Sequence, residues 1–171
     1  MKSVQHSSAA LGFTLIELVI TLALVGLVAM VALPLYEVTS TRHREIELRQ
    51  ALRTIRTGLD AYKAATDSGV LPKAAGESGY PPSLDLLTQS LDTSGKRDFG
   101  LTASEASQRI VILRQLPRDP FFPDMQVPAA QTWDTRAYAS RADDPQPGAD
   151  VFDVSSKSSR AGLDGTTYNL W

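Results

Sequence analysis

The sequence contains no cysteine and only two histidines, His6 and His43. Without cysteine there is no disulfide, so a folded domain must be held by packing or by a bound ion. Neither histidine has neighbours at the spacing of a metal site or a nucleophile–base pair. The serines of residues 155–159 lack the pattern of a nucleophile elbow, and no phosphate-cradling glycine loop is present. We therefore expect that the chain is not an enzyme.

Strong charge imbalance is also absent. The formal net charge is −2 over 171 residues, so nothing in the composition favours nucleic acid as the main partner. The length is enough for one membrane helix followed by one compact domain with a modest core.

Charged side chains are missing from residues 18–36, a run long enough for a helix that crosses a bilayer. Glu17 stands at the start of this run, where a carboxylate in hydrocarbon costs roughly 2.5–3.5 kcal/mol and so needs a partner or a function. The polar leader ends at Gly12, and cleavage there would leave the apolar helix on the mature protein. The alternative is a generic signal anchor in which Glu17 lies near the lipid headgroups.

Residues 12–17, Gly-Phe-Thr-Leu-Ile-Glu, resemble the class III signal of type IV pilins and type II secretion pseudopilins. The resemblance implies that a prepilin peptidase cleaves between Gly12 and Phe13 and methylates the Phe13 amine. It also implies that Glu17 is the assembly glutamate. The Phe13 amine of a neighbouring subunit would supply the cation that a carboxylate in lipid requires.

The segment after the apolar run has one apolar face at helical spacing, and its charged side chains face elsewhere. This pattern predicts one helix from residue 13 to about residue 66, with the apolar stripe toward a core. Glu45 and Arg49 are spaced for an i,i+4 ion pair. The stripe consists of Leu48, Leu52, Ile55, Leu59 and Tyr62.

Gly26 and Pro34 lie inside the predicted helix. Proline removes a backbone donor and clashes with the preceding turn, and glycine adds flexibility. Membrane helices tolerate such a kink. The resemblance adds a second interpretation, in which this middle segment loosens when subunits pack into a filament.

The rest of the chain predicts short elements and loops, and together with the helix an α+β, type IV pilin-like fold. In this fold the long N-terminal helix, with a membrane-embedded first half, packs on a small antiparallel β-sheet. Three prolines make residues 117–123 a rigid surface turn. The predicted strands are residues 133–140, 150–155 and 166–170. The other predicted segments are loops at 70–83 and 92–100, a short helix capped by Ser83, and residues 104–116, which fit a helix or a strand.

Several segments of this second half resemble the major pseudopilin of type II secretion: Tyr80-Pro81, residues 116–121, a strand with Tyr138, residues 151–156 and Trp171. Missing cysteines weigh against a typical major type IV pilin, because such pilins commonly close their C-terminal loop with a disulfide.

Major pseudopilins share a calcium site in the C-terminal loop. Here residues 155–165 contain one acid, Asp164, beside the cations Lys157 and Arg160. Calcium takes six to eight oxygen ligands and usually more than one carboxylate. Asp164 is therefore either a calcium ligand or part of a plain turn, with serine hydroxyls and Tyr168 holding the loop.

The resemblance implies a structural subunit of a type II secretion pseudopilus that drives export of folded proteins across the outer membrane. Its partners would be further copies of itself, minor pseudopilins, prepilin peptidase and the inner-membrane secretion platform. Lys2 predicts a cytoplasmic N-terminus in the inner membrane and a periplasmic C-terminal domain. The expected parts are a leader (1–12), a transmembrane and polymerisation half-helix (13–36) and a globular domain (37–171). The alternatives are a type IV pilus subunit, major or minor, and a monomeric membrane-anchored binding domain.

Overall fold

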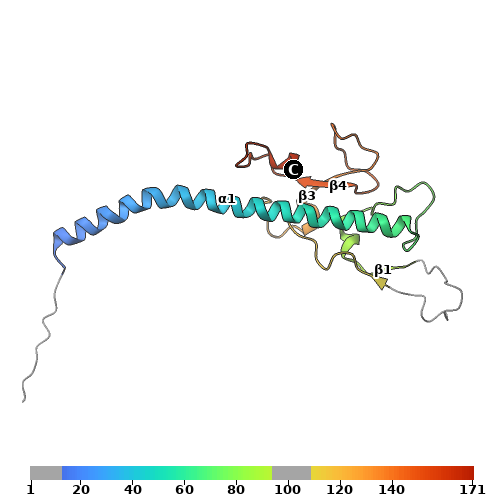
Figure 1. Cartoon of the computed structure of the whole chain (residues 1–171), viewed down its shortest axis with the longest axis horizontal. Helices are drawn as coiled ribbons and strands as arrows, with labels where there is room; N and C mark the ends of the chain where they lie inside the picture. Colours follow the sequence, from blue (N-terminus) through green and yellow to red (C-terminus); the bar gives the residue numbers. More distant parts are fainter. Residues whose placement is uncertain (1–12, 94–108) are drawn as a thin grey trace, which may run out of the picture. The chain divides into compact units, whose positions relative to one another are not determined.

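The computed structural model describes residues 13–93 and 109–171 (Figure 1). The chain forms two compact units that divide between Thr41 and Arg42, here called the N-terminal and the C-terminal unit. Helix α1, Leu15–Asp67, begins in the first unit and ends in the second. The expected leader and Gly12 lie outside the described residues, as do residues 94–108 of the predicted second half.

The N-terminal unit is helical from Leu15 onward, and the helix continues without a break through Gly26 and Pro34. Thr14 caps its start, because the Thr14 hydroxyl accepts a hydrogen bond from the Glu17 backbone N–H at 3.3 Å. Residues 13–39 are all exposed in this structure. The flexibility expected of Gly26 and Pro34 stays a prediction.

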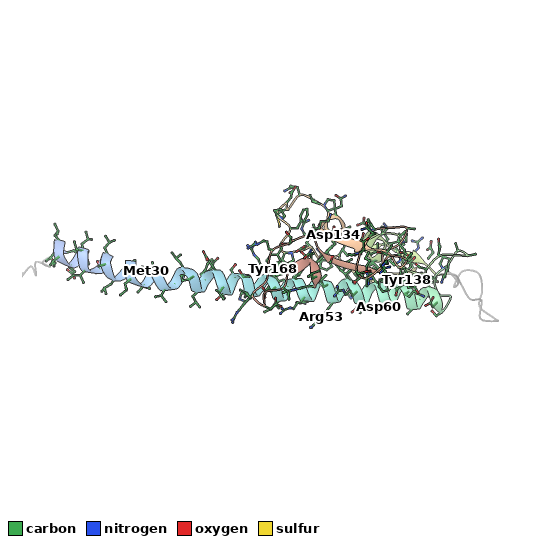
Figure 2. The ribbon with its side chains drawn as sticks, turned by 90° about the horizontal axis from the view of Figure 1, so that it is seen from above. Met30, Arg53, Asp60, Asp134, Tyr138 and Tyr168 are labelled. Carbon is green, nitrogen blue, oxygen red and sulfur yellow. The ribbon has the colours of Figure 1, made fainter. Side chains whose placement is uncertain are left out.

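In the C-terminal unit, the predicted apolar stripe of α1 faces the core, which confirms the helical pattern. Leu48, Leu52, Ile55 and Leu59 are at most 3% exposed. Figure 2 shows Arg53 and Asp60 along the open side of the same helix. The partners of the stripe in the core are Leu84, Leu87, Leu116, Trp133, Val151, Val154 and Tyr168.

Helix α1 ends where Gly69 adopts a left-handed conformation with φ of +75°. The Gly69 N–H donates to the Thr66 carbonyl at 3.0 Å, and the Val70 N–H donates to the Ala65 carbonyl at 2.9 Å. These bonds satisfy carbonyls of the last turn, and glycine adopts the required backbone angle without strain.

Two small antiparallel sheets complete the C-terminal unit. Strand β1 (Leu91–Asp92) pairs with β2 (Arg109–Ile110), and β3 (Trp133–Arg136) pairs with β4 (Asp153–Ser156). In the second sheet Trp133 lies opposite Ser156, and Arg136 lies opposite Asp153. One long N-terminal helix with small antiparallel sheets confirms the expected α+β, pilin-like fold.

The third predicted strand, residues 166–170, is wrong. Thr167 forms only an isolated bridge with Ala161, and the 3₁₀ helix η3 (Tyr168–Leu170) follows at once. The Trp171 N–H donates to the Tyr168 carbonyl at 3.2 Å, so the chain turns within residues 168–171 and does not continue as a strand. This turn lets both Tyr168 and Trp171 reach the core, whereas successive side chains of a strand alternate between its faces.

Other elements differ from their predictions in extent. Strand β3 ends at Arg136 because the Ser140 N–H bonds to the Ala137 carbonyl at 3.1 Å and closes a turn. The short helix is the 3₁₀ helix η1 (Leu84–Thr88), and Ser83 makes no side-chain cap. A further 3₁₀ helix, η2 (Ala129–Thr132), leads into β3.

Candidate functional site

The N-terminal unit carries an extensive apolar surface. Each of its large hydrophobic side chains between residues 13 and 36 is between 51% and 84% exposed. Helix α1 is long and apolar enough to cross a membrane. Soluble monomers rarely expose a continuous apolar surface of this kind, and the helix is compatible with a single-pass membrane anchor.

Glu17 and Phe13 lie at the start of this surface, and both are exposed. Within the described part of the chain, the Glu17 carboxylate has no hydrogen-bond or ion-pair partner, although its backbone N–H is capped by Thr14. The structure therefore leaves the carboxylate available to a group from outside the chain. The cleavage, methylation and assembly roles of these residues stay predictions.

A buried glutamate holds the C-terminal loop, residues 157–167, against α1. Glu45 is 5% exposed, and its Oε1 atom accepts hydrogen bonds from the Leu163 N–H at 2.7 Å and the Tyr168 hydroxyl at 3.1 Å. Burial, followed by the bond to Glu45, raises the pKa of Tyr168 above its usual value. The expected Glu45–Arg49 pair is wrong, because Glu45 serves the loop and Arg49 pairs with Asp164.

Asp164 lies in a ring of four side chains, here called the loop clamp: Arg49, Asp164, Thr166 and Trp171. The Asp164 Oδ1 atom accepts from the Thr166 hydroxyl at 2.7 Å and the Thr166 N–H at 3.0 Å, while Oδ2 lies 3.5 Å from Arg49 Nη2. The bond from the Thr166 hydroxyl contributes most to lowering the pKa of Asp164. The Trp171 indole N–H donates to the Thr166 hydroxyl at 2.6 Å, and the Arg49 guanidinium lies 4.3 Å from the Trp171 ring centroid.

These surroundings fit a guanidinium better than a calcium ion. Both oxygens of Asp164 are already engaged, and a cation occupies the position beside Oδ2. Among residues 13–93 and 109–171, no three acidic, histidine or cysteine side chains are close enough together to hold a metal.

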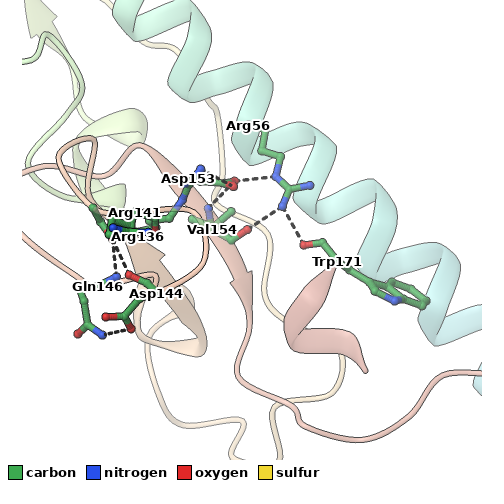
Figure 3. Close-up of polar contacts among 9 residues, drawn as sticks. Arg56, Arg136, Arg141, Asp144, Gln146, Asp153, Val154 and Trp171 are labelled. Atoms are coloured by element: carbon green, nitrogen blue, oxygen red, sulfur yellow. Dashed lines mark hydrogen bonds and ion pairs between the residues drawn. The ribbon is translucent and has the colours of Figure 1, made fainter. Parts of the chain in front are cut away.

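Arg56 joins α1 to two later segments (Figure 3). Its Nε donates to Asp153 Oδ1 at 2.8 Å, and its Nη2 donates to the Val154 carbonyl at 3.0 Å and to the main-chain oxygen of Trp171 at 2.8 Å. The planar guanidinium suits this geometry because its donors point in fixed directions. Sequence reasoning missed this role, since two of the three acceptors are backbone oxygens.

Asp119 is 3% exposed, so residues 117–123 are not the surface turn that the prolines predicted. Its Oδ2 accepts from the Ser156 hydroxyl at 2.5 Å, and its Oδ1 accepts from the Phe121 N–H at 2.8 Å. The segment is irregular, as expected, but it ties β4 to the interior. Phe121 and Phe122 follow Asp119 in the sequence, and two adjacent aromatic residues were a signal of burial. The Phe121 ring stacks on Tyr168 at a centroid distance of 4.0 Å.

Comparison with known proteins gives one informative match. The type IV major alpha-pilin of Moraxella bovis is 32% identical to this chain over 102 residues, which is 60% of the chain and 54% of the relative. The chain thus spans about half the length of the curated relative that it matches. No protein-family profile matches the chain, and no solved structure matches it.

The match and the long apolar N-terminal helix together support the type IV pilin superfamily. A pilin relative also agrees with the expectation that the chain is not an enzyme.

Proposed function

We propose that this chain is a membrane-anchored structural subunit that polymerises through helix α1 into a pilin-type filament. The observation that carries the proposal is the exposed apolar surface of residues 13–36 in a chain similar to a pilin. Before assembly, lipid covers this surface. After assembly, the helices of neighbouring subunits replace the lipid, and packing between helices holds the filament together.

Processing comes first in this proposal. Prepilin peptidase cleaves between Gly12 and Phe13 and methylates the new Phe13 amine, and Glu17 then pairs with that amine on a neighbouring subunit. The exposed, unpartnered Glu17 carboxylate within the described part of the chain supports such a pairing. Gly26 and Pro34 give the middle of the apolar helix room to loosen during packing. Intact-mass analysis of the mature protein tests the cleavage and the methyl group together.

Among filaments, a type II secretion pseudopilus agrees with the missing cysteines and with the motifs of the second half. The subunit would lie in the inner membrane with its C-terminal unit in the periplasm. It would polymerise with itself and with minor pseudopilins on the secretion platform. A second candidate, a type IV pilus subunit, is favoured by the similarity to a type IV major pilin. Deletion of the gene separates the two, because a pseudopilin mutant accumulates periplasmic cargo and a pilus mutant loses surface pili.

Glu17→Ala tests polymerisation itself. The absence of native cysteine allows a single introduced cysteine in the N-terminal unit to report contacts between subunits as a crosslinking ladder. We expect Glu17→Ala to be cleaved and inserted but to give no ladder. Glu37→Ala, an exposed glutamate on the same helix, is the matched control and should keep the ladder. A normal ladder from Glu17→Ala would overturn the proposal.

A further inference from the structure

We infer that Arg49, and not a calcium ion, supplies the positive charge that holds the C-terminal loop of this chain in place. The loop would then keep its structure without any metal. This inference is independent of which filament the subunit builds, since it concerns the C-terminal unit alone.

The first step is charge. Asp164 is the only acid in the C-terminal loop, whereas a calcium site usually gathers more than one carboxylate. Glu45, the buried acid under the loop, already binds Leu163 and Tyr168 through Oε1. A single free carboxylate needs only one positive charge, and Arg49 supplies it at 3.5 Å.

The second step is geometry. The Arg49 guanidinium lies over the Trp171 ring at 4.3 Å from the centroid and reaches Asp164 with Nη2. A planar cation can lie over an aromatic face and pair with a carboxylate at its edge at the same time. The Trp171 indole then bonds to Thr166, and Thr166 bonds back to Asp164, so the contacts form a closed ring.

The third step is connection. Arg49 belongs to α1, Asp164 and Thr166 to the loop, and Trp171 to the segment after η3. The loop clamp therefore joins three separate segments of the chain. Loss of the Arg49 guanidinium removes two of the five contacts in the loop clamp, the cation–π contact and the ion pair, and leaves Asp164 without a cation.

Limited trypsin digestion of the full chain in detergent micelles tests this inference. Lys157 and Arg160 are cleavage sites within the loop, and Arg141 is an exposed site elsewhere in the C-terminal unit. The ratio of loop cleavage to Arg141 cleavage cancels any direct effect of calcium on the protease. For the parent chain, we expect this ratio to be the same in chelator and in millimolar calcium.

Two matched variants complete the experiment. Arg49→Ala should raise the loop cleavage ratio by about fivefold, because losing an exposed ion pair and a cation–π contact together costs about 1 kcal/mol. Calcium should not restore the protection. Arg44→Ala removes an exposed arginine of α1 that does not line the pocket around the loop clamp, and it should match the parent. Protection of the parent loop by calcium, or equal cleavage of the two variants, would overturn the inference.

Discussion

The Tyr168 hydroxyl donates a hydrogen bond to Glu45 Oε1 at 3.1 Å, across 123 positions of sequence. Both residues are buried, and the same carboxylate oxygen accepts from the Leu163 N–H. One acid on α1 therefore holds both the C-terminal loop and η3. A buried donor has no water to replace a lost acceptor, so the bond between Tyr168 and Glu45 contributes more to stability than an exposed bond would.

Replacing Glu45 with alanine should destabilise the C-terminal unit by about 1–3 kcal/mol, because it leaves the buried Tyr168 hydroxyl and the partly buried Leu163 N–H without an acceptor. Glu47→Ala removes an exposed glutamate two residues later and should change stability by less than about 0.5 kcal/mol. Urea denaturation of both variants in detergent, monitored by Trp fluorescence, measures the difference in their free energy of unfolding. Equal denaturation midpoints would show that the Glu45 bonds do not stabilise the fold.

Tyr168 should make the fold sensitive to alkaline pH. Its pKa is raised above 10.0 by burial and by the bond to Glu45, so the folded chain keeps the phenol proton longer than the unfolded chain does. The resulting stabilisation is fully present below the unfolded pKa, near 10, and is lost as pH rises through the folded value. Absorbance at 295 nm, taken as the difference between the parent and Tyr168→Phe, should show this delayed ionisation. Ionisation of Tyr168 at an ordinary pH would contradict the prediction.

Arg56→Met should weaken the attachment of β4 and Trp171 to α1. The substitution keeps most of the side-chain volume but removes the donors to Asp153, Val154 and Trp171. We expect a loss of about 1–2 kcal/mol, since the site is partly exposed and water replaces some of the bonds. Thermal unfolding gives the measurement, and Arg53→Met is the control. If both variants unfold at the same temperature, the Arg56 contacts do not stabilise the fold.

The apolar stripe predicts a contrast between two isoleucines of α1. Ile55 is 0% exposed and Ile46 is 59% exposed. Ile55→Ala should cost about 2–5 kcal/mol through lost burial and the cavity left behind. Ile46→Ala should leave the stability of the single subunit in detergent nearly unchanged. Chemical denaturation of both variants in detergent tests this, and similar losses from both would mean that the helix face is assigned wrongly.

The long helix and its buried face were predictable from sequence because helical periodicity repeats over many turns. The period is carried by several positions, among them Leu48, Leu52 and Ile55, so the prediction of a helix does not depend on any one residue. The loop positions were harder, because each depends on one turn rather than on a repeat. Residues 166–170 alternate like a strand, but burial of Tyr168 and Trp171 together required a 3₁₀ turn.

The polar contacts of the C-terminal unit were mostly beyond sequence reasoning. Glu45 lies three residues before Leu48 and so continues the buried stripe, which was a usable signal. The spacing of Glu45 and Arg49 suggested a local pair. In the structure, Glu45 bonds to Tyr168 and Arg49 pairs with Asp164, each more than a hundred residues away. Two of the three Arg56 acceptors could not be found from the sequence, because every residue has a backbone oxygen.

The three bonds of Arg56 have a consequence for biosynthesis. The acceptors Val154 and Trp171 are 98 and 115 residues further along the chain than the arginine that binds them. While the polypeptide emerges from the ribosome, Arg56 must therefore wait for acceptors that are not yet made, and Leu84 and Leu87 are the first core residues that can cover the apolar stripe. A subunit threaded through a membrane during synthesis would reach its native packing only after these late segments arrive, and a chaperone that shields the stripe would act in this interval.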